Sequence, residues 1–273
     1  MWKSLREHTI RRHRLSAIAL GMAGAVVAMQ FTGILQLLEW AVLDQWFRLR
    51  PPEDGESRAV VVTIDEADIA NLGVWPISDL TLATLIEKLK QHQPRAIGLD
   101  LYRDLPVEPG RKSLLKVFET TPNLFAIEKV VSGKNGRAIS KPAGLQGRSQ
   151  VGASDLVQDS DGKLRRNLLS VRIEKPAAQP TALTKYTPQT TDALGVKLAL
   201  AYLKVEGISP RSSADRRSLQ LGKAHLQPLR TNEGGYVRAD IGGFQILSNF
   251  YRFKSGTPTI SITAVLQDRV PAT

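Results

Sequence analysis

The sequence contains one long stretch without any charged residue, from Leu15 to Leu38. A helix needs about 20 apolar residues to cross the hydrocarbon core of a bilayer, and this stretch exceeds that length. Residues 1–14 carry five lysines and arginines against one acid, Glu7. Because strongly basic flanks stay on the cytoplasmic side, we expect residues 1–14 to form a cytoplasmic basic tail and the bulk of the chain to lie outside.

A cleaved signal peptide is the main alternative for this segment, since small residues occur near Ala28. The apolar run is longer than the usual h-region, and it is apolar on every face, unlike most core helices. We therefore interpret residues 15–38 as a retained transmembrane helix of a single-pass inner-membrane protein. Residues 39–58 are predicted to continue it as a juxtamembrane amphipathic helix and linker, which Pro51 and Pro52 end.

The remaining residues, 59–273, show the alternating pattern of an α/β domain. Short β-branched runs alternate with segments whose apolar residues recur at helical spacing. The expected elements are strands at 59–64, 94–100 and 123–131 and helices at 79–92, 112–121 and 192–204, with Asp79 and Asp192 as caps. This order predicts a mixed, largely parallel sheet flanked by helices and preceded by one N-terminal transmembrane helix.

Composition excludes several classes of function. The net charge is +11, but the basic residues do not cluster with aromatic ones, so we expect no nucleic-acid partner. Cysteine is absent and the four histidines are scattered, which argues against a zinc site. Neither a phosphate-binding glycine loop nor a serine-hydrolase elbow is present. We therefore expect no cofactor and no bound metal.

Two carboxylates follow apolar strands at the end where parallel strands bind ligands. Asp65 ends "VVVTID" and Asp100 ends "AIGLD". On adjacent strands these acids would lie at one edge of the sheet and could share a cation or a proton, as in a metal-dependent enzyme that uses both. Alternatively, they cap the following segments or pair with arginines such as Arg103. No further metal ligand or phosphate-binding lysine accompanies them.

Two other features have an ordinary and a functional interpretation. Trp75 precedes Pro76 and is either a core residue or a platform that stacks on a ligand. The segment "DSDG" at 159–162 resembles the start of a calcium loop but lacks the closing glutamate. Its Asp161-Gly162 pair predicts a tight hairpin turn.

Several segments together resemble a known family. They are "DQWFRLRPPE", "TIDEADIANLGVWP", "PRAIGLDLYRD", "GASDLVQDSDGKLRR", "QILSNFYR" and "ISITAVLQDRVP". In this order they resemble the second class of CHASE domain, the cyclase/histidine-kinase-associated sensory extracellular domain of bacterial receptors. The resemblance implies an extracytoplasmic sensory module for an unknown stimulus, without catalysis of its own, whose output is a cyclase or histidine kinase module.

The chain departs from the family pattern in two places. Ile77 and Asp79 stand where a tryptophan and an arginine are usual, and the chain stops at Thr273, where family members continue. We therefore expect a C-terminally incomplete sensory domain, with its output module in trans or lost and with a homodimer as one assembly. Its candidate ligand-binding residues are Asp65, Glu66, Trp75, Asp100 and Arg165.

Overall fold

The computed structural model describes residues 2–53, 58–133, 136–176, 186–213, 218–250 and 256–270. The chain divides into two compact units. The first unit comprises Met1–Pro51 and Leu229–Ile241, and the second comprises Pro52–Pro228 and Gly242–Thr273. A segment from the C-terminal part of the chain, Leu229–Ile241, therefore completes the N-terminal unit.

The first unit begins with two helices, α1 (Trp2–Thr32) and α2 (Gln36–Leu49). Within α1, His13–Thr32 is long and apolar enough to cross a membrane, by length and composition, and it is the one such segment in the described part of the chain. Gly33 has a φ of +83°, a left-handed conformation that commonly ends helices. The continuous helix expected from the sequence is therefore interrupted by a turn at residues 33–35.

The loop Leu229–Ile241 packs on one face of α2. Trp40 is 3% exposed and lies against Leu229 and Tyr236, with the two aromatic ring centroids 5.0 Å apart. The backbone N–H of Val237 donates to Gln36 Oε1 at 2.8 Å. This small apolar cluster and its hydrogen bond hold the loop to the helix.

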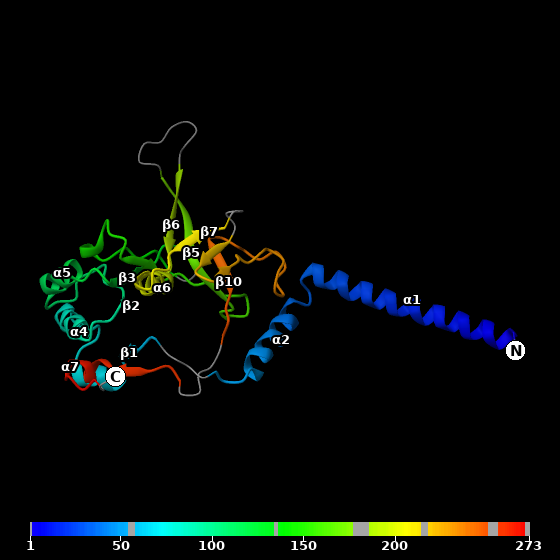
Figure 1. Cartoon of the computed structure of the whole chain (residues 1–273), viewed down its shortest axis with the longest axis horizontal. Coiled ribbons are helices and arrows are strands. Elements are labelled where there is room, and N and C mark those ends of the chain that lie inside the picture. The colour runs from blue at the N-terminus through cyan, green and yellow to red at the C-terminus, as the bar shows by residue number, and fades with distance from the viewer. Residues whose placement is uncertain are drawn as a thin grey trace. The chain divides into compact units, whose positions relative to one another are not determined.

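The second unit contains two parallel sheets in its described residues (Figure 1). One pairs β1 (Val61–Thr63) with β11 (Thr259–Ser261), and the other has the order β2 (Ile97–Leu99), β3 (Leu124–Glu128), β4 (Val151–Ala153). The helices of this region are α3 (Glu66–Leu72), α4 (Asp79–Gln91), α5 (Arg111–Thr120) and α7 (Ile262–Leu266). Helix α4 packs against both α5 and α7.

One hydrophobic core joins these parts. Fully buried side chains of α4, α5, β3 and α7 meet in it, among them Leu82, Phe118, Leu124 and Ile262. Val62 of β1 packs against the same cluster. The two parallel sheets therefore share a core although their strands are not hydrogen-bonded to each other.

Two antiparallel sheets complete the described part of this unit. One has the order β10 (Phe244–Leu247), β5 (Arg166–Pro176), β6 (Tyr186–Asp192), and the other β7 (Pro210–Ser212), β8 (Leu219–Leu221), β9 (Ala224–Leu226). Helix α6 (Leu194–Val205) packs on β3 and β4, and a short 3-10 turn, η1 (Ala143–Leu145), packs on α5. The Pro/Thr-rich segment, interpreted from the sequence as a surface linker, contributes the ends of β5 and β6, while 177–185 lies outside the described residues.

These observations confirm a mixed α/β fold with one apolar N-terminal helix, but not a largely parallel sheet. Described strands form two parallel and two antiparallel sheets. Strand β1 pairs with β11 rather than with β2, so the expected pairing of the strands before Asp65 and Asp100 is wrong. The partner strand is only three residues long and comes from the far end of the chain, where no local pattern predicts it.

Candidate functional site

Asp65 is the N-cap of α3. Its Oδ1 accepts from the backbone N–H of Asp68 at 2.8 Å, and its own backbone N–H donates to Asp68 Oδ2 at 3.1 Å. This reciprocal capping box satisfies two donors at the start of the helix. One of the two candidate catalytic carboxylates therefore has a local structural role, which is one of the alternatives left open by the sequence.

Asp68 connects α3 to the C-terminal strand and helix. It is 2% exposed, and its Oδ1 accepts from Ser261 Oγ at 2.6 Å and from the Thr263 backbone N–H at 3.2 Å. Burial alone would raise the pKa of Asp68. The hydrogen bonds from Ser261, Thr263 and Asp65 outweigh burial and lower the pKa to about 2.

Two segments join to form what we call the loop surface, residues 74–80 and 100–111. The backbone N–H groups of Asp79 and Leu80, at the start of α4, donate to the carbonyls of Val107 and Pro109 at 2.7 and 2.8 Å. Gly110, with a φ of +111°, fits tightly here, because an added Cβ would lie 2.3 Å from Leu80 N. The loop after β2 is therefore fixed on the N-terminus of α4.

A buried ion cluster lies within the loop surface. The Asp79 side chain is 0% exposed, with Oδ1 3.5 Å from Arg103 Nε and Oδ2 3.4 Å from Arg111 Nη1. Arg103 Nη2 also donates to the Ile77 carbonyl at 2.8 Å. Burial lowers the pKa of Arg103, Asp79 opposes this, and Arg111 adds to it. The cluster ties the turn before α4 to the segment after β2.

Apolar side chains are exposed around this cluster. Within the loop surface, Val74, Trp75, Leu80 and Leu105 are 48%, 54%, 47% and 71% exposed. The peptide bond between Trp75 and Pro76 is cis. Because Trp75 is 54% exposed, it is not a core residue, and its contact with a ligand stays a prediction.

Asp100 is exposed and follows β2 directly. Because β2 pairs with β3 and β1 pairs with β11, Asp100 and Asp65 do not end adjacent strands. The hypothesis of a shared carboxylate site loses its geometric basis. Arg103, considered from the sequence as a partner of these acids, pairs with Asp79 instead. Glu66 lies exposed in the first turn of α3.

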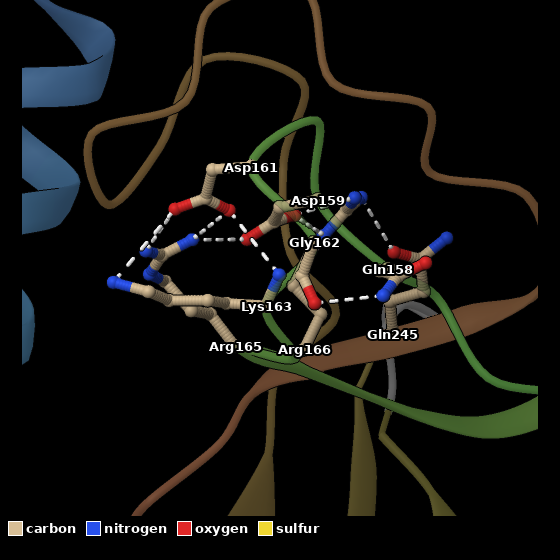
Figure 2. A network of polar contacts seen from close by, with 8 residues as sticks. All are labelled: Gln158, Asp159, Asp161, Gly162, Lys163, Arg165, Arg166 and Gln245. Atoms are coloured by element: carbon tan, nitrogen blue, oxygen red, sulfur yellow. Dashed lines mark hydrogen bonds and ion pairs between the residues drawn. The ribbon is translucent and has the colours of Figure 1, made fainter.

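A second charged network surrounds the turn that precedes β5 (Figure 2). Asp159, with a side chain 0% exposed, accepts from Arg165 Nη1 at 3.0 Å and from Arg166 Nε and Nη2 at 3.1 and 2.9 Å. Gly162 N donates to the Asp159 carbonyl at 2.9 Å, and Gly162 has a φ of +82°. The turn predicted at Asp161-Gly162 is present, but it does not form the predicted hairpin, because β4 before it pairs with β3 and β5 after it pairs with β10 and β6.

The network also reaches the neighbouring strand. Arg166 Nη1 donates to Gln245 Oε1 of β10 at 3.0 Å. Arg165 forms a two-pronged pair with Asp161, at 3.0 and 2.6 Å, and this hydrogen bonding lowers the pKa of Asp161. Both carboxylates thus accept from guanidinium groups, which is the geometry of an ion-pair network rather than of a calcium loop.

The five predicted ligand-binding residues fall in three separate places. Asp65 and Glu66 start α3, Trp75 and Asp100 belong to the loop surface, and Arg165 belongs to the network of Figure 2. Sequence reasoning missed the Asp79 cluster. The serine before Asp79 could have indicated it. Ser78, rather than the predicted Asp79, caps α4, since Ser78 Oγ accepts from Thr81 N at 3.2 Å. The Asp79 carboxylate pairs with Arg103 and Arg111 instead. Likewise, Ala193 rather than Asp192 is the N-cap of α6.

The buried acids of these sites connect separate segments of the fold. In the ranges that the structure describes, no group of three or more histidine, aspartate or glutamate side chains is arranged to hold a metal ion. The buried acids Asp68, Asp79 and Asp159 each have a hydrogen-bonded or ion-paired partner in another segment. The exposed apolar residues of the loop surface are the part available to an outside molecule.

Comparison with known proteins gives one match. The family model described as the CHASE2 domain matches residues 21–273. No curated protein and no solved structure matches the chain. The matched range includes α2, the Asp65 cap, the loop surface and the network of Figure 2.

Proposed function

The chain belongs to the CHASE2 domain family, a family of sensory extracellular domains of signal-transduction receptors, and from that membership we propose that it is a membrane-anchored sensory module of a bacterial receptor. The family match over residues 21–273 is the single observation that carries the proposal. Residues 59–273 form the extracytoplasmic sensory domain in this proposal, and the output is a cyclase or histidine kinase module.

The N-terminal segment supports a single-pass anchor in the inner membrane. The segment His13–Thr32 is mainly apolar, with Arg14 as its one lysine, arginine or acid, and its exposed side chains include Leu15, Ile18 and Leu20. An exposed helix of this composition is costly in water and favourable in a bilayer. The basic tail at residues 1–14 supports an N-terminus in the cytoplasm and a sensory domain on the opposite side.

The loop surface is the proposed contact site for the stimulus, with Trp75 and Asp100 as its ligand-binding residues. It joins an exposed tryptophan and an exposed leucine to a rigid support made of backbone hydrogen bonds and the Asp79 cluster. Exposed apolar groups on a fixed frame favour recognition, because little conformational entropy is lost on binding. Asp65 and Arg165, in contrast, stabilise the fold.

Topology reporters test the anchor. Alkaline phosphatase, which is active only outside the cytoplasm, and green fluorescent protein, which fluoresces efficiently only inside it, are fused in turn after Thr273. We expect phosphatase activity without fluorescence. Fluorescence without phosphatase activity would place the folded domain in the cytoplasm and refute the proposed topology.

A second assay separates a sensor from a metal-dependent enzyme. The purified full chain is incubated with p-nitrophenyl phosphate and Mg²⁺, alongside a variant in which Asp65→Asn and Asp100→Asn are combined. We expect both proteins to release nitrophenol at the background rate. Turnover by the wild type that the double variant lacks would support the enzyme and contradict the sensor.

A further inference from the structure

The exposed side of α2 is apolar. Leu38, Val42, Trp46 and Leu49 are 65%, 50%, 67% and 78% exposed. Their spacing along the helix places them on one side. We call this set the α2 stripe. The opposite side of α2 is already occupied, because Trp40 packs there on the loop Leu229–Ile241.

A helix that is apolar on both sides is stable only when both sides are covered. Within α2, the exposed residues include no acid: they are Leu37, Leu38, Ala41, Val42, Gln45, Trp46, Arg48 and Leu49. Both acids of the helix, Glu39 and Asp44, are half-buried. What covers the α2 stripe must therefore accept apolar side chains and tolerate a neighbouring cation.

The position of α2 in the chain favours a lipid surface. The turn at Gly33 separates α2 from the proposed membrane span, His13–Thr32, by only three residues. The first turn of α2 is therefore at the level of the lipid headgroups if the span crosses the membrane. The turn also frees α2 from continuing the direction of α1. Tryptophan is enriched at this depth, and Trp46 is in the stripe.

Charge points the same way. Arg48 is exposed beside the α2 stripe, whereas the loop on the other side of the helix has exposed arginines, Arg230 and Arg238, balanced by exposed acids, Glu233 and Asp240. Arginines near an anionic bilayer bind its headgroups, and a long side chain reaches them from a helix that lies in the interface. An apolar side with one flanking arginine, on a helix without an exposed acid of its own, is the pattern of an interfacial helix.

A second copy of the chain is the competing occupant. Leu38, Val42, Gln45 and Leu49 have the spacing of a coiled-coil seam. Helix α2 has 14 residues, however, and ends before Pro51. That length gives two heptads, whereas coiled coils recognisable from sequence sustain at least about three. The bilayer is the occupant better supported by these residues.

We propose that α2 lies in the outer headgroup region of the membrane, with Leu38, Val42, Trp46 and Leu49 inserted at the acyl boundary, so that the sensory unit is held against the bilayer by a second contact besides the span. This inference rests on the proposed anchoring of α1. The loop Leu229–Ile241 packs on α2. In this proposal, that loop would transmit a change at the membrane surface.

Spin labelling tests the inference, and the chain contains no native cysteine to interfere. Single cysteines replace Trp46, Ala41 and Ile18 in the full chain, which is reconstituted into vesicles of phosphatidylethanolamine with a minority of phosphatidylglycerol. Each nitroxide is then measured for collisions with oxygen, which concentrates in lipid, and with a nickel chelate, which stays in water. Ala41 is the control, since it is exposed next to Arg48 at the edge of the exposed side of α2 that lies farthest from Trp46.

We expect the ratio of oxygen to nickel collisions to be several-fold higher at Trp46→Cys than at Ala41→Cys, and higher still at Ile18→Cys. A label at 46 that reacts with nickel as the one at 41 does, while the label at 18 is in lipid, would overturn this inference alone. Labels in water at both 18 and 46 would also overturn the anchor. If the label at position 46 is shielded from both reagents and its spectrum shows dipolar broadening by a label on another chain, the α2 stripe contacts a second copy of the protein instead. A label at Val42→Cys measures the same collision ratio at a second position of the α2 stripe.

Discussion

Arg103 and Asp79 form an ion pair inside the second unit, with side chains 6% and 0% exposed and Nε 3.5 Å from Oδ1. Arg111 approaches the other carboxylate oxygen at 3.4 Å. Three segments, namely the turn before α4, the loop after β2 and the start of α5, are therefore joined through one buried carboxylate. Removal of that charge leaves two guanidinium groups facing each other in a poorly solvated place.

Replacement of Asp79 by asparagine should therefore destabilise the protein strongly. We expect a loss of about 3–5 kcal/mol in the free energy of unfolding, the range for breaking a buried pair. Denaturant unfolding of the full chain in detergent measures it. Asp100→Asn, at an exposed position of the same loop surface, is the control and should change stability little. Equal effects of the two substitutions would contradict the assignment.

Asp159 should matter more than Asp161 in the network of Figure 2. The Asp159 side chain is 0% exposed and accepts from both arginines, whereas the Asp161 side chain is 24% exposed. We expect Asp159→Asn to cost about 3–5 kcal/mol and Asp161→Asn less than about 1 kcal/mol in the same unfolding measurement. A larger cost at Asp161 would show that the network is supported mainly from its solvent side.

Gly110→Ala tests the close approach of the loop to α4. An added Cβ would lie 2.3 Å from Leu80 N, and the residue has a φ of +111°. Gly147→Ala is the matched control, because Gly147 has a φ of +76° but nothing within 4 Å of the added atom. We expect the control to cost about 1 kcal/mol from backbone strain and Gly110→Ala to cost about 1–3 kcal/mol more from the clash. Similar costs would mean that the loop moves aside easily.

Acid should weaken the connection between α3 and the C-terminal strand. The pKa of Asp68 is lowered from 3.8 to about 2 in the folded protein, so the unfolded chain binds more protons in this range. The stabilisation is therefore complete above about pH 4 and is lost as the pH falls toward 2. We expect Asp68→Asn to flatten the dependence of unfolding free energy on pH in this window, and Ser261→Ala to flatten it partly. An unchanged profile in both variants would refute this role of Asp68.

Local patterns in the sequence predicted the elements of the second unit well. The helix expected at 79–92 is Asp79–Gln91, and the strand expected at 123–131 is the shorter Leu124–Glu128. Helical spacing and β-branched runs are local properties, so they could be read without knowing the fold. The Asp161-Gly162 turn was predicted for the same reason.

Long-range partners could not be read in this way. Nothing in the sequence around Val61 indicates that its strand pairs with Thr259, and nothing near Asp79 indicates Arg103 and Arg111. The predicted pairing of the strands before Asp65 and Asp100 was wrong for that reason, and the shared site inferred from it loses its basis. The break at Gly33 was missed because apolar residues continue on both sides of it.

The packing of the loop Leu229–Ile241 on α2 also affects the order in which parts of the protein can fold. The Val237 backbone N–H donates to Gln36 Oε1 across 201 residues of chain, so Trp40 packs on Leu229 and Tyr236 only after the intervening residues have been synthesised. Contacts of such separation form late, after most loop-closure entropy has been lost. The first unit can therefore close only after residues 229–241 have been synthesised, and β1 gains its partner strand β11 later still.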